Sequence, residues 1–129
     1  MPTDNTAVIR ELYDAFARGD IPVVAARLQN TEWHEAEGLP YGGVYHGADA
    51  IFQQVLGPVG ADVEGFSARP DEYLPAGEDR VLAIGRYAGK GPAGPLDAAF
   101  AHLWTVRDGA VVKFVQYADT HKYRQALGG

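Results

Sequence analysis

Three side chains of the sequence could carry acid/base chemistry: Asp119, His102 and Glu35. Asp119 ends a predicted strand among aromatic residues. Such neighbours keep water from a carboxyl group and raise its pKa, so Asp119 could take or give a proton near neutral pH. His102 is predicted on the same face, where its imidazole could pair with Asp119 or with a ligand. Glu35 is a second candidate for the base, and the sequence leaves the choice between the two carboxyl groups open.

Each of these residues also has a purely structural interpretation. Asp119 could cap a helix that begins near Thr120, and His102 could be a core histidine whose hydrogen bonds are satisfied. Glu35 could accept hydrogen bonds from loop amides at residues 41–43. These alternatives predict no chemistry at the three positions.

A hairpin predicted from Ala98 to Asp119 positions two of the candidates. Asp108-Gly109 lies between β-branched and aromatic runs, and this dipeptide is a strong signal for a two-residue turn. Such a turn places Val106 opposite Val111, and side chains then alternate between the two faces. One face is predicted to hold Phe100, His102, Trp104, Val115, Tyr117 and Asp119, and the other Ala99, Ala101, Leu103, Thr105, Val112, Phe114, Gln116 and Ala118. Both are too apolar for water, so we expect one to line an interior and the other to meet a partner.

Length and composition limit the class of protein. The 129 residues suit one core, so we predict a single domain over residues 1–129. The absence of cysteine excludes thiol catalysis, disulfides and cysteine metal sites. A net charge of −6 without a basic block argues against nucleic acid as a partner. No apolar run is long enough to cross a membrane and no signal peptide is evident, so we expect a cytoplasmic protein that acts on something small.

The order of predicted elements is typical of an α+β protein. Two helices come first, at residues 5–18 and 20–28, with Asp4 or Thr3 as the cap of the first and Asp20 as the cap of the second. The rest is predicted as a strand at 31–36, a Gly-rich loop at 37–47, a helix at 49–56 ended by Gly57-Pro58, strands at 63–74 and 80–88, a mobile Gly- and Pro-rich connection at 89–95, strands at 96–106 and 110–119, and a helix at 120–127. Helices on one side of a curved antiparallel sheet would enclose a pocket against its concave face.

Four stretches of the sequence resemble a known family. The pattern W-x-E-A-E-G-L-P-Y-G-G-V-Y-H-G-A-D-A-I at 33–51 resembles the SnoaL-like, ketosteroid isomerase-related group of the nuclear transport factor 2-like (NTF2-like) superfamily. The patterns G-R-Y at 85–87, A-H-L-W-T-V-R-D-G at 101–109 and Q-Y-A-D-T at 116–120 support the match. The resemblance implies a cone-shaped α+β barrel, in which a curved antiparallel sheet wraps around an N-terminal helical hairpin and encloses a pocket. It also implies a homodimer formed through the sheet.

The resemblance suggests roles for single residues. SnoaL-type cyclases are similar in placing an acidic residue at the end of the last strand as the acid/base, which corresponds to Asp119. Steroid isomerases take their base from an early segment, which favours Glu35, and they polarise a carbonyl group with a tyrosine and a protonated aspartate. Tyr13 lies in a comparable place on the first helix. Residues 101–103 offer no second acid, so the full pair is not evident.

The function expected from these features is cofactor-free proton transfer next to a carbonyl group, by isomerisation or aldol-type ring closure, on a mostly apolar small molecule. The residues predicted to bind this substrate are Tyr13, Trp33, Tyr41, Tyr45, Phe100, Trp104 and Tyr117. A non-catalytic protein that binds a hydrophobic ligand in the same pocket is the alternative, and a structural dimer with a filled core is the third. The histidine and acidic residues lack metal-site spacing, so we expect no metal and no cofactor. The expected partners are a hydrophobic small molecule and a second copy of the chain.

Overall fold

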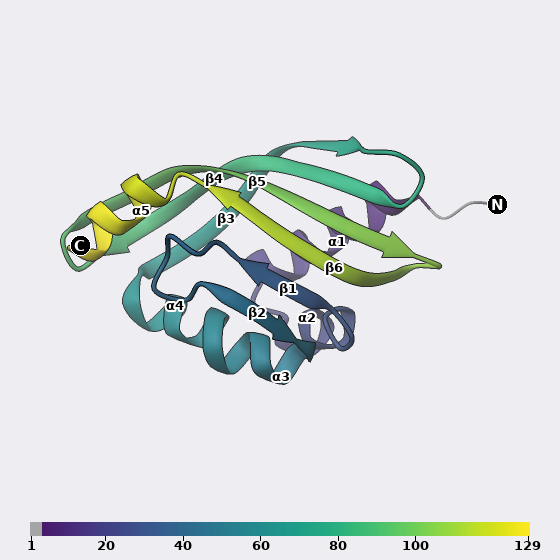
Figure 1. The fold of residues 1–129 in the computed structure, drawn as a ribbon, viewed down its shortest axis with the longest axis horizontal. Coiled ribbons are helices and arrows are strands. Elements are labelled where there is room, and N and C mark those ends of the chain that lie inside the picture. Colours follow the sequence, from purple (N-terminus) through teal and green to yellow (C-terminus); the bar gives the residue numbers. More distant parts are fainter. Residues whose placement is uncertain (1–3) are drawn as a thin grey trace.

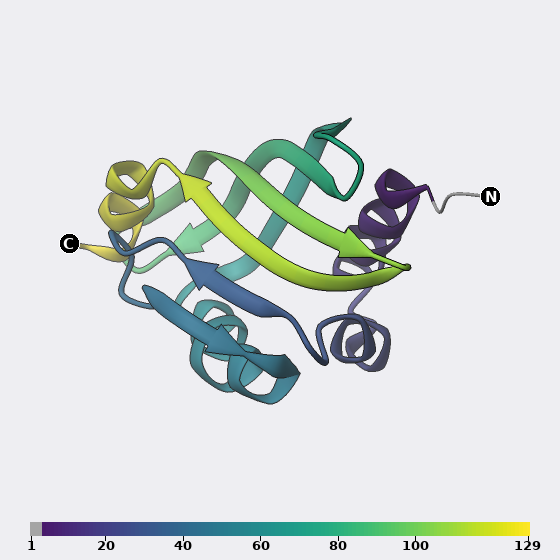
Figure 2. The same ribbon diagram turned by 45° about the vertical axis from the view of Figure 1, so that its right-hand side comes forward.

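The computed structural model describes residues 4–129, which form one curved sheet with helices on one side. The elements are, in order, α1 (Asn5–Ala17), α2 (Ile21–Arg27), β1 (Glu32–Glu35), β2 (Gly43–His46), α3 (Gly47–Ile51), η1 (Phe52–Leu56), α4 (Gly57–Asp62), β3 (Glu64–Pro75), β4 (Arg80–Gly91), β5 (Gly94–Arg107), β6 (Ala110–Ala118) and α5 (Thr120–Leu127). The strands form a single sheet in the order β2-β1-β6-β5-β4-β3. Figures 1 and 2 show α1 to α4 gathered on one side of this sheet and α5 at one of its ends. The predicted α+β class, with the sheet wrapped around the N-terminal helices, is confirmed.

The two N-terminal helices begin at capping aspartates, as the sequence predicts. Asp4 accepts hydrogen bonds from two backbone N–H groups in the first turn of α1, and Asp20 accepts one from Val23 in α2. The other predicted cap, Thr3, lies outside the described residues. The buried side of α1 consists of Val8, Ile9, Leu12, Tyr13 and Ala15, and it packs against the sheet. None of the helices in residues 4–129 is both long and apolar enough to span a membrane.

The helix predicted at 49–56 is longer than expected. It begins at Gly47 and continues as α4 to Asp62, so the prediction that Gly57-Pro58 ends it is wrong. Residues 52–56 form a π-helical turn, in which the backbone N–H of Gly57 donates to the carbonyl oxygen of Phe52. Pro58 therefore falls in the first turn of α4, where proline is tolerated. A Cβ atom on residue 57 would lie 2.7 Å from the carbonyl oxygen of Phe52, so this turn requires glycine.

The stretch predicted as a loop at 37–47 contains a strand. Residues Gly43–His46 form β2, which pairs with β1 in antiparallel fashion and places Tyr45 opposite Trp33. On its other side β1 pairs with β6 in parallel fashion, with Trp33 opposite Phe114. This pairing brings the early strand into the middle of the sheet and turns Trp33 and Glu35 toward the concave face.

The connection predicted as irregular at 89–95 is mostly strand. β4 continues to Gly91 and β5 begins at Gly94, so only two residues separate them and the prediction is wrong. Gly91 allows a close approach of two backbones, because a Cβ atom on residue 91 would lie 2.3 Å from the carbonyl oxygen of Ala126 in α5. This glycine therefore lets the last helix pack against the end of the hairpin.

The hairpin of β5 and β6 has the predicted turn. Asp108 and Gly109 have φ angles of +52° and +76°, which a two-residue turn of this kind requires. Val106 pairs with Val111, also as predicted. Beyond this pair the predicted register is wrong, because Val112 forms a β-bulge with no partner of its own.

The bulge exchanges the two faces of β6 beyond Val112. Thr105 pairs with Lys113 and Trp104 with Phe114, one residue away from the predicted register. The concave face consequently carries Phe114, Gln116 and Ala118 beside Phe100, His102 and Trp104. The predicted placement of Val115, Tyr117 and Asp119 on that face is wrong.

Candidate functional site

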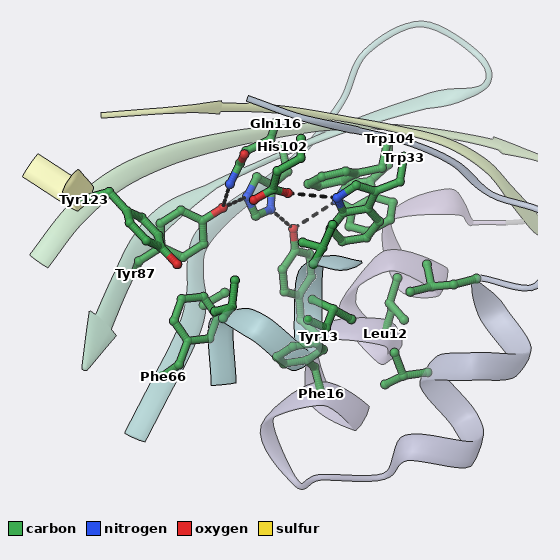
Figure 3. Close-up of a pocket in the computed structure, with 18 residues that line it drawn as sticks. Leu12, Tyr13, Phe16, Trp33, Phe66, Tyr87, His102, Trp104, Gln116 and Tyr123 are labelled. Carbon is green, nitrogen blue, oxygen red and sulfur yellow. Dashed lines mark hydrogen bonds between the residues drawn. The ribbon is translucent and has the colours of Figure 1, made fainter. Parts of the chain in front are cut away.

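A cavity of about 60 Å³ lies between the concave face of the sheet and the helices α1, α2, η1 and α4. Most of its lining is apolar and consists of Leu12, Phe16, Val24, Leu28, Val55, Leu56, Val59, Phe66, Ala68 and Phe114. The residues that bring polar atoms to it are Tyr13, Trp33, Glu35, Tyr87, His102, Trp104, Gln116 and Tyr123. Figure 3 shows His102 and Gln116 at the sheet, with Phe16 and Phe66 on the opposite side. An apolar cavity with a few converging polar groups is the usual form of a small-molecule site.

Glu35 brings a carboxyl group into this cavity from β1. Its side chain is only 6% exposed, and its Oε1 accepts a hydrogen bond of 2.9 Å from the indole Nε1 of Trp33. Burial raises the pKa of Glu35 from 4.5 to about 7, while the side chains of Trp33 and Gln116 lower it by less. A carboxyl group with such a pKa can accept a proton from a bound molecule and return it at neutral pH.

His102 lies between two tyrosine hydroxyl groups (Figure 3). Its Nδ1 is hydrogen-bonded to the hydroxyl of Tyr13, and its Nε2 lies 2.5 Å from the hydroxyl oxygen of Tyr87. Burial lowers the pKa of His102 to about 3, so the imidazole is neutral at physiological pH. Burial also raises the pKa of both tyrosines well above the ordinary value, so both phenols keep their protons.

The two tyrosine hydroxyls accept further hydrogen bonds at the outer ends of this chain. The Nε1 of Trp104 donates to the hydroxyl of Tyr13 at 3.0 Å, and the Nε2 of Gln116 donates to that of Tyr87 at 2.7 Å. The Oε1 of Gln116 accepts a hydrogen bond of 2.8 Å from the backbone N–H of Ala36, the residue after Glu35. The polar chain therefore runs across the sheet from Trp104 to the strand that carries the buried carboxyl group.

Five of the residues predicted for the site line the cavity: Glu35, His102, Tyr13, Trp33 and Trp104. Asp119 does not. It is exposed and is the N-cap of α5, where its carboxylate accepts a hydrogen bond of 3.1 Å from the backbone N–H of Lys122. The alternative interpretation of Asp119 as a helix cap is thus confirmed, and the bulge in β6 explains why the residue is absent from the aromatic face.

The remaining four predicted residues lie outside the cavity lining. Tyr117 is 58% exposed on the convex face of the sheet. The hydroxyl of Tyr41 donates to Asp62 at 2.7 Å, and that of Tyr45 donates to the backbone carbonyl of Tyr41 at 2.7 Å, so both hold the segment around β2. Phe100 stacks on the imidazole of His102, with ring centroids 4.0 Å apart, and supports it from the side.

Tyr87 and Gln116, which belong to the polar chain, are lining residues that the sequence predictions left out. Within the strand predicted at 80–88, alternation of side chains puts Tyr87 on one face with Val81, Ala83 and Gly85. The pairing of β4 with β5 joins this face to that of His102. The sequence predicted a hairpin connection at 89–95, whereas only two residues separate the strands. Recognition of that short turn would have fixed the pairing register and placed Tyr87 on the face of His102. Gln116 was assigned to the opposite face, and only knowledge of the bulge at Val112 could have moved it.

The groups in the cavity suit proton transfer and hydrogen bonding to an oxygen atom. They comprise one carboxyl group that titrates near neutral pH, one neutral imidazole and phenol hydroxyls, and the lining includes no lysine or arginine. Within residues 4–129, no three His, Cys, Asp or Glu side chains gather in a way that could hold a metal ion. The arrangement therefore offers a base and hydrogen-bond donors to an uncharged, mostly apolar molecule.

Comparisons with known proteins agree with this fold. The sequence profile of the SnoaL-like domain matches residues 9–114. The solved structure of an NTF2-like protein from Burkholderia thailandensis is 31% identical, with 95% of each chain covered and a TM-score of 0.88. An NTF2-like protein of unknown function from Burkholderia pseudomallei is 28% identical, with 98% of this chain and 99% of that chain covered and a TM-score of 0.87. TerC, co-crystallised with polyporic acid, is 26% identical, with 98% and 100% covered and a TM-score of 0.86. No curated protein matches the sequence.

Proposed function

The chain belongs to the SnoaL-like domain family, and from this premise we propose that it is a cofactor-free enzyme that transfers a proton next to a carbonyl group of a small, mostly apolar molecule. The reaction is an isomerisation or an aldol-type ring closure. The single observation that carries the proposal is Glu35, a buried carboxyl group with a pKa of about 7 in the wall of an apolar cavity. A base whose pKa lies near the working pH is the most effective at moving a proton in both directions.

The base in this proposal is Glu35 rather than Asp119. Removing a proton from the carbon next to a carbonyl group leaves negative charge on the carbonyl oxygen, and a nearby hydroxyl donor stabilises that charge. The hydroxyls of Tyr13 and Tyr87 are the candidate donors, because both reach the cavity and both stay protonated. His102 holds the two hydroxyls and does not itself take the proton, since its pKa is far too low.

The size of the cavity limits the substrate. Its volume of about 60 Å³ has room for a few water molecules or a small organic fragment as the side chains stand. Phe16, Leu56 and Phe66 line the cavity and are only half-buried, and Figure 3 shows Phe16 and Phe66 on the side away from the polar chain. We expect a larger substrate to enter there by displacing these three side chains.

A non-catalytic protein that binds a hydrophobic ligand in the same cavity is the second candidate. The apolar lining favours it, because such a lining retains a ligand whether or not Glu35 reacts with it. The co-crystallisation of TerC with polyporic acid supports a small organic ligand for both candidates. The two differ in turnover, which is the property to measure.

The test follows proton transfer on small ketones in D₂O. The compounds are 3-cyclohexenone, whose isomerisation to the conjugated enone is read by ultraviolet absorbance, and cyclohexanone, whose deuterium uptake is read by mass spectrometry. The variant is Glu35→Gln, and the matched control is Glu37→Gln, since Glu37 is an exposed carboxylate two residues further along. We expect at least a hundredfold loss of rate in Glu35→Gln and none in Glu37→Gln.

Three results decide between the candidates. Isomerisation or exchange by the wild type that disappears in Glu35→Gln supports the enzyme. Equal rates in the wild type and Glu35→Gln contradict Glu35 as the base. Binding of these ketones without any turnover favours the ligand-binding protein.

A further inference from the structure

The hydrogen bonds around His102 leave one donor hydrogen without a partner among residues 4–129. Trp104 already fills one acceptor position on the oxygen of Tyr13, and Gln116 fills one on the oxygen of Tyr87. Two hydrogen bonds remain to be assigned a donor, one between Tyr13 and Nδ1 of His102 and one between Tyr87 and Nε2.

Three hydrogens are available for those two hydrogen bonds. Each tyrosine hydroxyl supplies one, and a neutral imidazole supplies one, on either Nδ1 or Nε2. If the hydrogen is on Nδ1, it is donated to Tyr13, and Tyr87 donates to Nε2. If it is on Nε2, the two tyrosines exchange roles. In both tautomers the tyrosine that accepts from His102 keeps its own hydroxyl hydrogen free.

The surroundings of the ring keep His102 neutral and in place. Phe100 stacks on one face with ring centroids 4.0 Å apart, and Phe114 stands edge-on at 4.8 Å. Both nitrogens are occupied by tyrosine hydroxyls, and no charged side chain of residues 4–129 hydrogen-bonds to either. The imidazole is 4% exposed, so water does not supply a further partner from outside.

We infer that His102 is a positioning residue whose tautomer decides whether Tyr13 or Tyr87 presents a free hydroxyl hydrogen to the cavity, and that the cavity consequently takes a ligand with an acceptor oxygen, a ketone or its enolate. The inference deepens the proposed function, on which it rests, by naming the residue that decides which of the two hydroxyls meets the carbonyl oxygen. It also gives the protein two alternative places for that oxygen, one beside Trp104 and one beside Gln116.

The tautomer can change without any change in total charge. Starting from Nδ1–H, the hydroxyl hydrogen of Tyr87 passes to Nε2 and the Nδ1 hydrogen passes to Tyr13. Tyr13 gives its own free hydrogen to water in the cavity, and water returns one hydrogen to Tyr87, so the two tyrosines and His102 again hold three hydrogens. A ligand oxygen that binds next to Tyr13 favours the Nδ1–H tautomer, and one next to Tyr87 favours Nε2–H. The cavity can therefore bind a ligand oxygen beside Tyr13 or beside Tyr87.

The test compares two probes of nearly the same shape, cyclohexanone and methylenecyclohexane, which differ in C=O against C=CH₂. Their dissociation constants are measured by isothermal titration calorimetry, the carbonyl stretching frequency of bound cyclohexanone by infrared spectroscopy, and the tautomer of His102 by ¹⁵N NMR on histidine-labelled protein. His34→Gln, His46→Gln and His121→Gln assign the His102 signal by elimination. We expect the ketone to bind about tenfold more tightly than the hydrocarbon, because one hydrogen bond is worth about this factor.

The variants Tyr13→Phe and Tyr87→Phe link the tautomer to the binding site of the oxygen. If the ketone complex shows Nδ1–H, we expect Tyr13→Phe to abolish the preference for the ketone and Tyr87→Phe to retain it; if it shows Nε2–H, the reverse. Tyr73→Phe is the control, since Tyr73 packs edge-on against Tyr13 but lies outside the cavity lining. The carbonyl frequency should fall on binding and return in the variant that loses the preference.

Several results would overturn the inference. These are equal binding of the two probes, no binding of either, an unshifted carbonyl frequency, an imidazole protonated on both nitrogens, or a tautomer that points to the wrong tyrosine. The measurements on the wild type test the inference even if a variant does not fold. Turnover that depends on Glu35 without a ketone preference defeats this inference alone, whereas a ketone preference without turnover defeats the proposed enzyme alone.

Discussion

The indole Nε1 of Trp33 lies 2.9 Å from the Oε1 of Glu35, and both side chains stand on the same face of β1 because the residues are two apart. The hydrogen bond favours the ionised carboxylate, while burial favours the protonated form. Burial is the larger effect, and the pKa of Glu35 is consequently raised to about 7. The balance between the two makes the activity and the stability of the protein depend on pH in predictable ways.

The first prediction concerns the pH profile of turnover. A base must be ionised to act, so kcat/KM should rise with pH and level off above a midpoint near 7. In Trp33→Phe the ionised carboxylate loses its indole donor, and the midpoint should move upward by about one pH unit. Phenylalanine keeps an aromatic ring against Phe114, whose ring centroid lies 3.8 Å from that of Trp33.

The control for this shift is Trp104→Phe. It removes an indole N–H that donates to Tyr13 rather than to Glu35, so the midpoint should stay where it is even if the rate falls. A midpoint that is the same in Trp33→Phe as in the wild type would show that the group titrating in the rate is not Glu35.

The second prediction concerns stability. Between the ordinary pKa of 4.5 and the raised value of about 7, the folded protein holds a proton on Glu35 that the unfolded chain has released. The free energy of unfolding therefore falls as pH rises through this window, by about 3 kcal/mol in total. Urea unfolding of the wild type, Glu35→Gln and Glu37→Gln at pH 5 and pH 8 measures the effect. Between these two pH values the fall should be smaller by about 2.5 kcal/mol in Glu35→Gln, and a fall of equal size in all three proteins would contradict the raised pKa.

The sequence was sufficient for most of the architecture because the relevant signals are local. The caps at Asp4 and Asp20, the turn at Asp108-Gly109 and the helix after Asp119 each depend on a few neighbouring residues, and each is found as predicted. The strand predicted at 31–36 also puts Glu35 and Trp33 on one face, because the two residues are two apart. These are features in which backbone preference and side-chain chemistry agree.

The errors share a different cause, which is dependence on distant parts of the chain. The bulge at Val112 leaves no mark in an otherwise regular β-branched run, yet it moves Gln116 into the cavity and Tyr117 out of it. The glycine at residue 91 was interpreted as a sign of irregular chain, whereas it makes room for α5, which the local sequence does not show. The polar chain through Tyr87 was missed for the same reason, since it depends on how three strands align.

The third prediction tests the role of Asp119. The carboxylate caps α5 and lies outside the cavity, so Asp119→Asn should keep both the cap and the turnover of the wild type. Asp119→Ala removes the cap and should lower the free energy of unfolding by about 1 kcal/mol, with kcat nearly unchanged. Urea unfolding and the ketone assay measure the two effects. A large loss of turnover in Asp119→Asn at unchanged stability would return the acid/base role to this residue.

The fourth prediction is a homodimer formed through the convex face of the sheet. In Figure 2, β5 and β6 cross the front of the molecule with no helix drawn over them. Their convex side carries Ala101, Leu103, Val115 and Tyr117, and β4 adds Leu82 and Ile84. Tyr117 is 58% exposed there, and an apolar patch of this kind is rarely left in contact with water. We propose that a second copy covers it, because one patch can face its own copy across a twofold axis.

Sedimentation velocity at micromolar concentration tests the dimer. The wild type should sediment at twice the mass of the chain, and Leu103→Lys or Val115→Lys should sediment as a monomer, because each places two like charges opposite one another at the centre of a twofold interface. Asp14→Lys also introduces a lysine, but on the exposed side of α1 and away from the sheet, so it should leave the dimer intact. The cavity opens on the other side of the sheet, so the monomeric variants should still bind cyclohexanone. A wild type that sediments as a monomer would contradict the prediction, since the convex face would then be stable in water without a partner.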